Sequence, residues 1–101
     1  MGHEGQIIDL WDGDGYGYVR LTEDGGFTLF EEWFGVGPRG DTEWINRIDA
    51  DQVPSLLGRF GRGPGELRAL MQEVARSARL RQEFRTEVRA MSREGNRFIW
   101  P

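Results

Sequence analysis

The sequence predicts an α+β domain, in which an antiparallel sheet of four or five strands is followed by two or three helices that pack on one face of the sheet. Two observations lead to this prediction. Residues 1–48 contain short segments of alternating apolar and polar character, separated by glycine-rich turns. Residues 49–95 instead place their apolar side chains at the helical spacings of three and four. Strands that precede helices, rather than alternating with them, are typical of the α+β class.

Four strands are expected in the first half of the chain. Their predicted ranges are Gln6–Trp11, Tyr16–Thr22, Phe27–Phe34 and Thr42–Ile48. The segments Asp12–Gly15 and Glu23–Gly26 are rich in Gly and Asp, which tolerate the backbone conformations of tight turns. Connections this short favour an antiparallel meander. The segment Gly35–Asp41 is expected to be a longer, mobile loop.

The segment FTLFEEWF, residues 27–34, is the most aromatic part of the chain. Successive strand residues point to opposite faces, so Phe27, Leu29, Glu31 and Trp33 share one face while Thr28, Phe30, Glu32 and Phe34 share the other. Because both faces carry aromatic rings, we expect at least partial cover on both sides, with Trp33, Phe30 and Trp44 holding the sheet core. Glu31 and Glu32 point apart and cannot act on one substrate atom, so each is expected to face solvent or an arginine.

A short helix and a longer helical region are expected after residue 49. Asp49 and Gln52 have the spacing of a capping box, and the helix that they start is expected to end near Gly61. The longer region runs to about Glu94 and carries two apolar stripes, rotated by roughly 110° from each other. The first stripe is Leu67, Leu70, Met71, Val74 and Ala78, and the second is Leu80, Phe84, Val88 and Met91. One straight helix cannot bury both against one surface, so we expect the helix near Ser77 either to kink or to stop and restart with Ser77 as the N-cap of the second part.

The second stripe is expected to meet a surface different from that of the first. The candidates are the tail, a partner protein, and a second copy of the chain in a homodimer. The tail, residues 96–101, is too apolar to be free and is expected to pack back on the domain, with an edge strand as one form. At 101 residues the chain is expected to be a single domain, made of a β-rich acidic part (1–48), a helical basic part (49–95) and this tail.

The composition leaves little material for catalysis. The chain has no cysteine and no lysine, and its single histidine is His3. The literal GxGxxG at Gly35–Gly40 precedes a predicted strand rather than a helix, and the DGDG segment lacks the remaining ligands of a calcium loop. We therefore expect no catalytic residue, metal or cofactor, and no enzyme. A cytoplasmic protein is predicted, because no apolar run reaches membrane-spanning length and no segment resembles a signal peptide.

Charge divides the chain into two parts. Residues 1–58 hold 12 acidic residues and 3 arginines, while residues 59–101 hold 5 acidic residues and 10 arginines. The acidic residues predicted to form a partner-binding face are Asp12, Asp14, Glu31, Glu32, Asp41 and Glu43. The arginines that recur every four residues along the predicted helix, and that form an alternative anion-binding row, are Arg81, Arg85, Arg89 and Arg93. One interpretation is that these arginines face solvent or are neutralised by the acidic part of the chain. The other is that they form a surface for an acidic partner.

In size, acidity and aromatic content, the chain resembles the small immunity proteins that neutralise bacterial toxins. The resemblance is one of composition and implies a protein-binding inhibitor of a toxin or another basic partner. An acidic surface suits that role, because complementary charge speeds association with a basic target. The alternative is a nucleic-acid-binding regulator that uses the arginine row, although the net charge of −4 is unfavourable for it.

Overall fold

The computed structural model describes residues 6–13, 15–37, 40–92 and 94–99 and has the predicted α+β architecture. Five antiparallel strands form one sheet in the order β1-β2-β3-β4-β5. The strands are β1 (Ile7–Asp12), β2 (Gly15–Leu21), β3 (Phe27–Gly37), β4 (Gly40–Ile48) and β5 (Glu94–Ile99).

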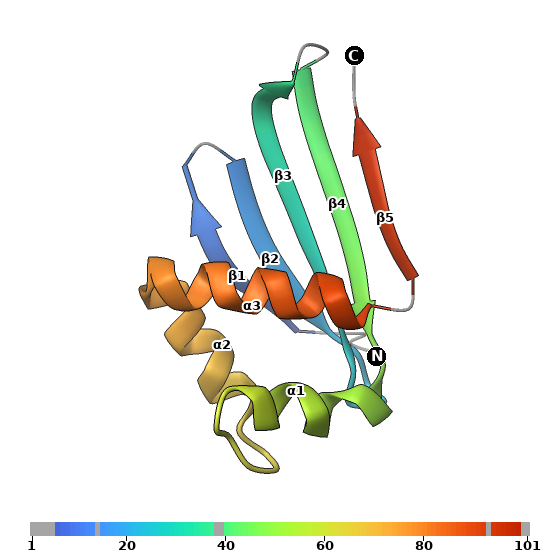
Figure 1. The fold of residues 1–101 in the computed structure, drawn as a ribbon, viewed down its shortest axis with the longest axis vertical. Helices are drawn as coiled ribbons and strands as arrows, with labels where there is room; N and C mark the ends of the chain where they lie inside the picture. Colours follow the sequence, from blue (N-terminus) through green and yellow to red (C-terminus); the bar gives the residue numbers. More distant parts are fainter. Residues whose placement is uncertain (1–5, 14, 38–39, 93, 100–101) are drawn as a thin grey trace.

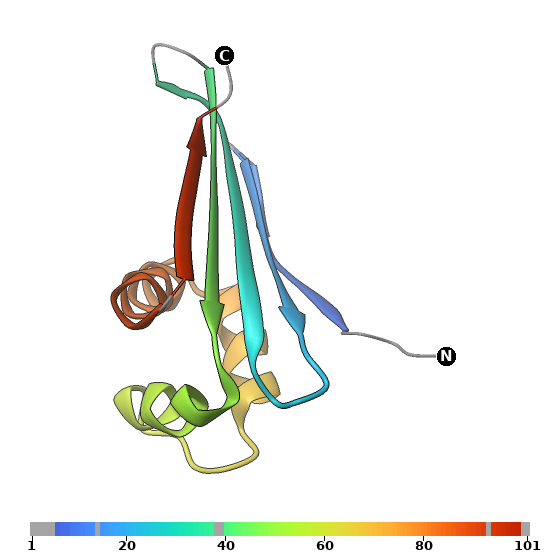
Figure 2. The same cartoon turned by 90° about the vertical axis from the view of Figure 1, so that its right-hand side faces the viewer.

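The helices are a 3₁₀ turn at Ala50–Gln52, then α1 (Val53–Arg59), α2 (Leu67–Arg76) and α3 (Ala78–Met91). The three α-helices lie on the same face of the sheet (Figure 1, and edge-on in Figure 2). None of the described helices is long and apolar enough to cross a membrane.

Pairing of neighbouring strands extends further than the sequence predicted. The segment Gly35–Asp41 was expected to be a loop, but β3 continues to Gly37, β4 begins at Gly40, and these two glycines pair. The pairing of β3 with β4 runs from Phe27 and Ile48 to Gly37 and Gly40. It has an irregularity where Gly35 adopts a φ of +62°. The tail also belongs to the sheet, because β5 pairs with β4 along its length.

A tight turn between β2 and β3 fixes how these two strands align. The Thr22 amide donates to the Gly26 carbonyl at 3.0 Å, and the Gly25 amide donates to Thr22 at 3.1 Å. Gly25 has a φ of +99°, a conformation that glycine adopts without strain. Asp24 accepts a hydrogen bond from the Gly26 amide at 3.1 Å. The turn thereby places Leu21 directly opposite Phe27.

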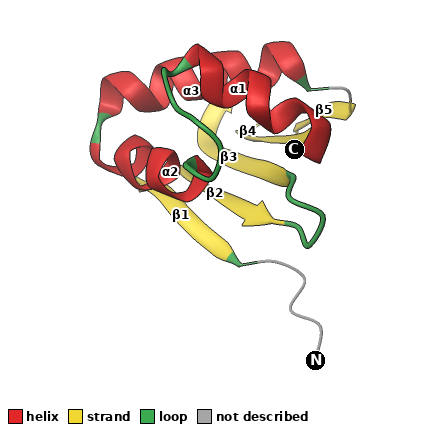
Figure 3. Ribbon diagram, turned by 90° about the horizontal axis from the view of Figure 1, so that it is seen from below, coloured by secondary structure: helices red, strands yellow, loops and turns green. Residues whose placement is uncertain are grey.

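The hydrophobic core lies between the sheet and the helices. Its sheet residues include Val19, Phe27, Leu29 and Ile48, all fully buried. A bulge in β1 also directs Leu10 toward the helices, so that Leu10 is buried beside them. In Figure 3, which views the sheet from below, the helices again occupy one side of the strands.

Helices cover one side of β3, and the other side, for which at least partial cover was expected, has only partly buried and exposed residues. Phe30 lies on the face without helices, where Tyr18 stacks on it with ring centroids 4.8 Å apart. Trp33 and Trp44 are on the helix-covered face but are half-buried, at the margin of the core. Aromatic residues on the uncovered face are therefore shielded by one another and not by a second layer of helices.

The break at Ser77 is confirmed. Ser77 has an extended conformation, and its hydroxyl accepts a hydrogen bond from the Leu80 amide at 3.2 Å, which caps α3. The change of direction lets both apolar stripes reach one core instead of two surfaces. Phe84 and Val88 are fully buried there, and Leu80 and Met91 pack against it. Phe84 and Val88 of the second stripe are thus interior to the chain, while Leu80 and Met91 are partly exposed.

Candidate functional site

The structure separates the acidic residues that the sequence grouped together. Asp12, Glu32 and Glu43 share the uncovered face, which we call the open face. Glu31 instead lies on the helix-covered face and is 1% exposed, so it cannot contribute to an exposed acidic surface. The reason is the alternation of β3, which sends adjacent residues to opposite faces. Asp14 and the side chain of Asp41 lie outside the described residues.

The open face carries a run of neighbouring aromatic rings that the sequence reasoning did not include in the site. Tyr16 lies 6.1 Å from Tyr18 and 6.0 Å from Phe34, and Tyr18 lies 4.8 Å from Phe30, measured between ring centroids. Tyr16 is 38% exposed and Phe34 is 47% exposed. With Ile7, these are the large apolar side chains that are exposed in the described part of the chain, and all three lie on the open face. The exposed rings of Tyr16 and Phe34 make the open face a candidate interaction surface.

Two carboxylates face each other at the end of this aromatic run. Glu32 on β3 is directly opposite Glu43 on β4. Like charges in this position destabilise a sheet. The Tyr16 hydroxyl donates a 2.6 Å hydrogen bond to Glu32, and this bond raises the pKa of Tyr16 to about 12. The proximity of Glu43 contributes to the same shift. This end of the open face is therefore both aromatic and electronegative.

The opposite end of the open face carries its arginines. The guanidinium of Arg20 lies 5.5 Å from the centroid of Phe30. Arg47 pairs with Asp49 at 2.9 Å and with Asp24 at 3.6 Å, so its charge is answered within the turn region. Arg20 and Arg47 both pair with Thr28, four residues before Glu32 in β3, so the positive side chains that the structure describes on this face lie away from Glu32 and Glu43.

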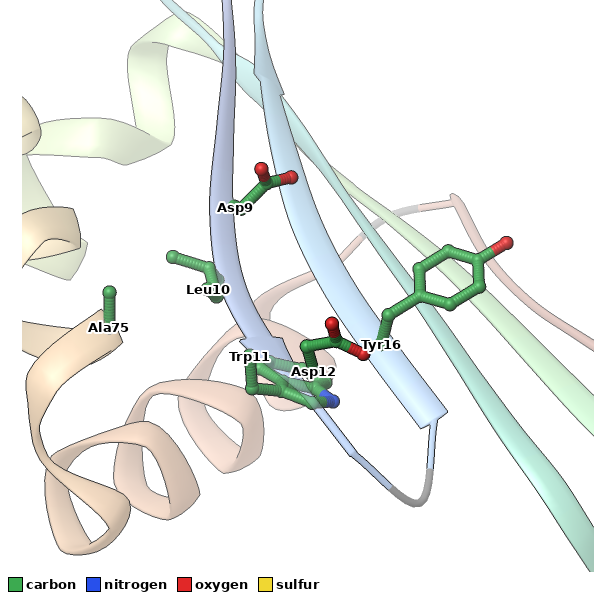
Figure 4. Close-up of a pocket in the computed structure, with 6 residues that line it drawn as sticks. All are labelled: Asp9, Leu10, Trp11, Asp12, Tyr16 and Ala75. Atoms are coloured by element: carbon green, nitrogen blue, oxygen red, sulfur yellow. The ribbon is translucent and has the colours of Figure 1, made fainter.

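A hollow of about 540 Å³ continues the acidic surface around the edge of β1. It is lined by Asp9, Leu10, Trp11, Asp12, Tyr16 and Ala75, as shown in Figure 4. Asp9 and Asp12 are exposed, and neither makes a salt bridge within the described residues. Figure 4 shows both carboxylates on the side of β1 to which Tyr16 points, while Leu10 points toward Ala75 of α2. The hollow therefore joins the open face to the edge of the sheet.

The arginine row of α3 lies against the helix-covered face. Glu31 accepts from Arg85 Nε at 2.6 Å and from Arg89 Nη2 at 3.0 Å, both at its Oε1 atom. The Trp33 indole N–H also lies 3.3 Å from that oxygen. Two positive charges surround one buried carboxylate, so the row is answered in large part by the acidic half of the chain.

Tryptophan rings provide the remaining contacts of the row. The guanidinium of Arg85 lies 4.6 Å from the centroid of Trp33, and that of Arg89 lies 4.3 Å from Trp44. Arg81 lies 5.9 Å from Trp11 and donates to the Ala75 carbonyl at 3.2 Å. Cation–π contacts of this kind are stronger where water is partly excluded. Three of the predicted anion-binding arginines are therefore engaged within the chain, and Arg93 lies outside the described residues.

The fold and this site define a small α+β protein with an antiparallel sheet whose second face is left open by its helices and is aromatic and acidic. Comparisons with protein-family models, with curated proteins and with solved structures found no match for the chain. Its function must therefore be argued from the chemistry of its two faces.

Proposed function

We propose that the chain is a protein-binding module whose open face docks a basic partner, in the manner of an immunity-type inhibitor that neutralises a toxin. The observation that supports this function best is the uncovered aromatic run from Phe34 through Tyr16 and Tyr18 to Phe30, with Glu32 and Glu43 beside it. Protein interfaces place aromatic anchors at their centre and charged groups around them. The open face has both features on one rigid sheet.

Charge favours a basic protein over other macromolecules. Asp9, Asp12, Glu32 and Glu43 lie on or beside the aromatic run, and Glu32 faces Glu43 directly. Such a field attracts arginine and lysine side chains and raises the rate of association with a basic surface. A target whose own site is basic, such as a nuclease, fits this field.

Nucleic acid is a less well supported partner. Exposed aromatic rings on a sheet can stack on bases, but phosphates must then be held by positive side chains. On the open face, carboxylates adjoin Tyr16 and Phe34, and a single described arginine, Arg20, lies against the run, 5.5 Å from Phe30. On the covered face, Arg85 and Arg89 already bind Glu31 and lie against tryptophan rings.

Site-specific photo-crosslinking tests the proposed function. A photoreactive phenylalanine analogue at position 34, on the open face, is expected to capture a basic protein in cells of the source organism. The matched control carries the analogue at Gln72, an exposed residue of α2, and is expected to give no adduct with that protein. Equal capture from both positions, or capture of nucleic acid from position 34, would contradict the proposal.

A further inference from the structure

The covered face shows how this chain binds an arginine. Arg85 donates to the carboxylate of Glu31 at 2.6 Å while its guanidinium plane lies 4.6 Å from the centroid of Trp33 and 5.5 Å from that of Trp11. The carboxylate supplies the charge-assisted hydrogen bond, and the rings supply a face for the cation. A planar guanidinium can make both contacts at once.

The open face repeats this arrangement without its cation. Glu32 follows Glu31 in β3 and points to the opposite side, toward Tyr16 and the neighbouring ring of Phe34. Directly across from it, Glu43 adds a second carboxylate. No described arginine pairs with either glutamate. Two facing carboxylates and two exposed rings are the complement of one guanidinium.

The facing carboxylates of Glu32 and Glu43 also indicate which charge a group bound between them should carry. Like charges directly opposite each other in a sheet destabilise it, and this pair is relieved when a cation sits between them. A hydroxyl or amide donor would satisfy a carboxylate oxygen but would leave the repulsion in place. The occupant must therefore be positive, and the exposed rings favour a flat cation over a compact ammonium group.

We propose that the end of the open face formed by Tyr16, Glu32, Phe34 and Glu43 receives an arginine side chain of the partner protein. The guanidinium lies against the rings and donates to both carboxylates. This inference rests on the proposed function, because it assumes that the open face is the docking surface. It adds the chemical identity of the side chain that anchors the partner there.

A defined peptide tests the inference without knowledge of the partner. A blocked peptide of alternating glycine and arginine is titrated into the full chain, and binding is followed by amide chemical shifts. The same peptide with citrulline retains the shape of arginine but loses the charge, and the peptide with lysine retains the charge but loses the plane. We expect shifts at Tyr16, Glu32, Phe34 and Glu43 with the arginine peptide, several-fold weaker binding with lysine, and none with citrulline.

Two double variants distinguish binding at the Glu32–Glu43 pair from attraction of the peptide by the net negative charge of the chain. Glu32→Gln with Glu43→Gln removes the facing pair and is expected to weaken binding of the arginine peptide by about tenfold or more, as expected for lost hydrogen bonds to charged groups. Glu23→Gln with Glu83→Gln changes the net charge equally at two exposed residues elsewhere, and is expected to leave the affinity within about twofold. Circular dichroism checks that both variants fold.

The outcomes decide between the inference and the proposed function. The arginine site is refuted if both double variants weaken binding equally, if lysine binds as tightly as arginine, or if the shifts map away from these four residues. The proposed function still stands in those cases when position 34 captures a basic protein by crosslinking. Peptide binding at the four residues together with capture from Gln72 alone would instead support the site and refute the open face as the natural docking surface.

Discussion

On the helix-covered face of β3, the Glu31 carboxylate accepts from Arg85 at 2.6 Å and from Arg89 at 3.0 Å; on the open face, its neighbour Glu32 faces Glu43. Both faces combine carboxylates with aromatic rings. On the covered face the cations come from α3, whereas on the open face the described residues supply none to the facing glutamates. Carboxylate, rings and cation are all present on the covered side of the strand, and the described residues supply no cation on the open side.

In the proposed function, one strand serves stability on its covered face and recognition on its open face. A buried carboxylate without a cation would destabilise the fold, so Glu31 is tied to α3. Glu32 is only partly buried and accepts a hydrogen bond from Tyr16, so it can remain without a cation at a modest cost. The covered face is therefore expected to determine whether the chain folds, and the open face to determine what it binds.

The largest expected contrast between the faces concerns two phenylalanines. Phe84→Ala removes a fully buried ring from the core and is expected to lower the free energy of unfolding by about 3–5 kcal/mol. Phe34→Ala, at a position that is 47% exposed, is expected to cost less than about 1 kcal/mol. Urea unfolding curves of the two variants measure both values. Similar losses would show that the open face is also part of the core.

A second contrast compares the adjacent glutamates. Glu31→Gln leaves Arg85 and Arg89 without their carboxylate and is expected to cost about 2–3 kcal/mol, below the range for fully buried pairs because both arginines are partly exposed. Glu32→Gln relieves the repulsion from Glu43 and is expected to change stability by less than about 0.5 kcal/mol. Denaturant unfolding in low and high salt measures both effects. A larger loss for Glu32→Gln would reverse the assignment of the two faces.

The smallest expected effect is the alkaline titration of Tyr16. Its hydrogen bond to Glu32 raises the pKa from 10.0 to about 12 in the folded chain. The folded state therefore holds this proton more tightly than the unfolded state, and the resulting stability is present below pH 10 and is lost as the pH rises toward 12. In a Tyr18→Phe background, ultraviolet absorbance reports the phenolate of Tyr16. Replacing Glu32 by Gln is expected to move the pKa back toward 10, and an unchanged titration would show that the hydrogen bond does not form in solution.

Local patterns in the sequence were sufficient for much of the fold. The alternation in β3 correctly predicted which of its residues share a face, and the rotation between the two helical stripes predicted an interruption near Ser77. The loop expected at Gly35–Asp41 was wrong because glycines suggest a break, whereas pairing with a neighbouring strand can continue through them.

The candidate site was harder to predict because it depends on contacts between distant residues. Glu31 and Arg85 are separated by 54 positions, and their pairing follows from the docking of α3 rather than from either local pattern. The aromatic run was visible as alternation in β2, where Tyr16, Tyr18 and Arg20 share a face. The missing information was which face of the sheet the helices leave uncovered.

The turn at Thr22–Gly26 helps to decide which of the two sides of β3 faces the helices. One side reads Phe, Leu, Glu, Trp and the other reads Thr, Phe, Glu, Phe, so composition barely distinguishes them. A slip of one residue would exchange the two sides and would still bring a glutamate, Glu32, beneath the arginines of α3. The hydrogen bonds of the turn and the positive φ of Gly25 prevent that slip by holding Leu21 opposite Phe27. The short turn and the fully buried Phe27 and Leu29 therefore specify together which side of β3 faces the helices.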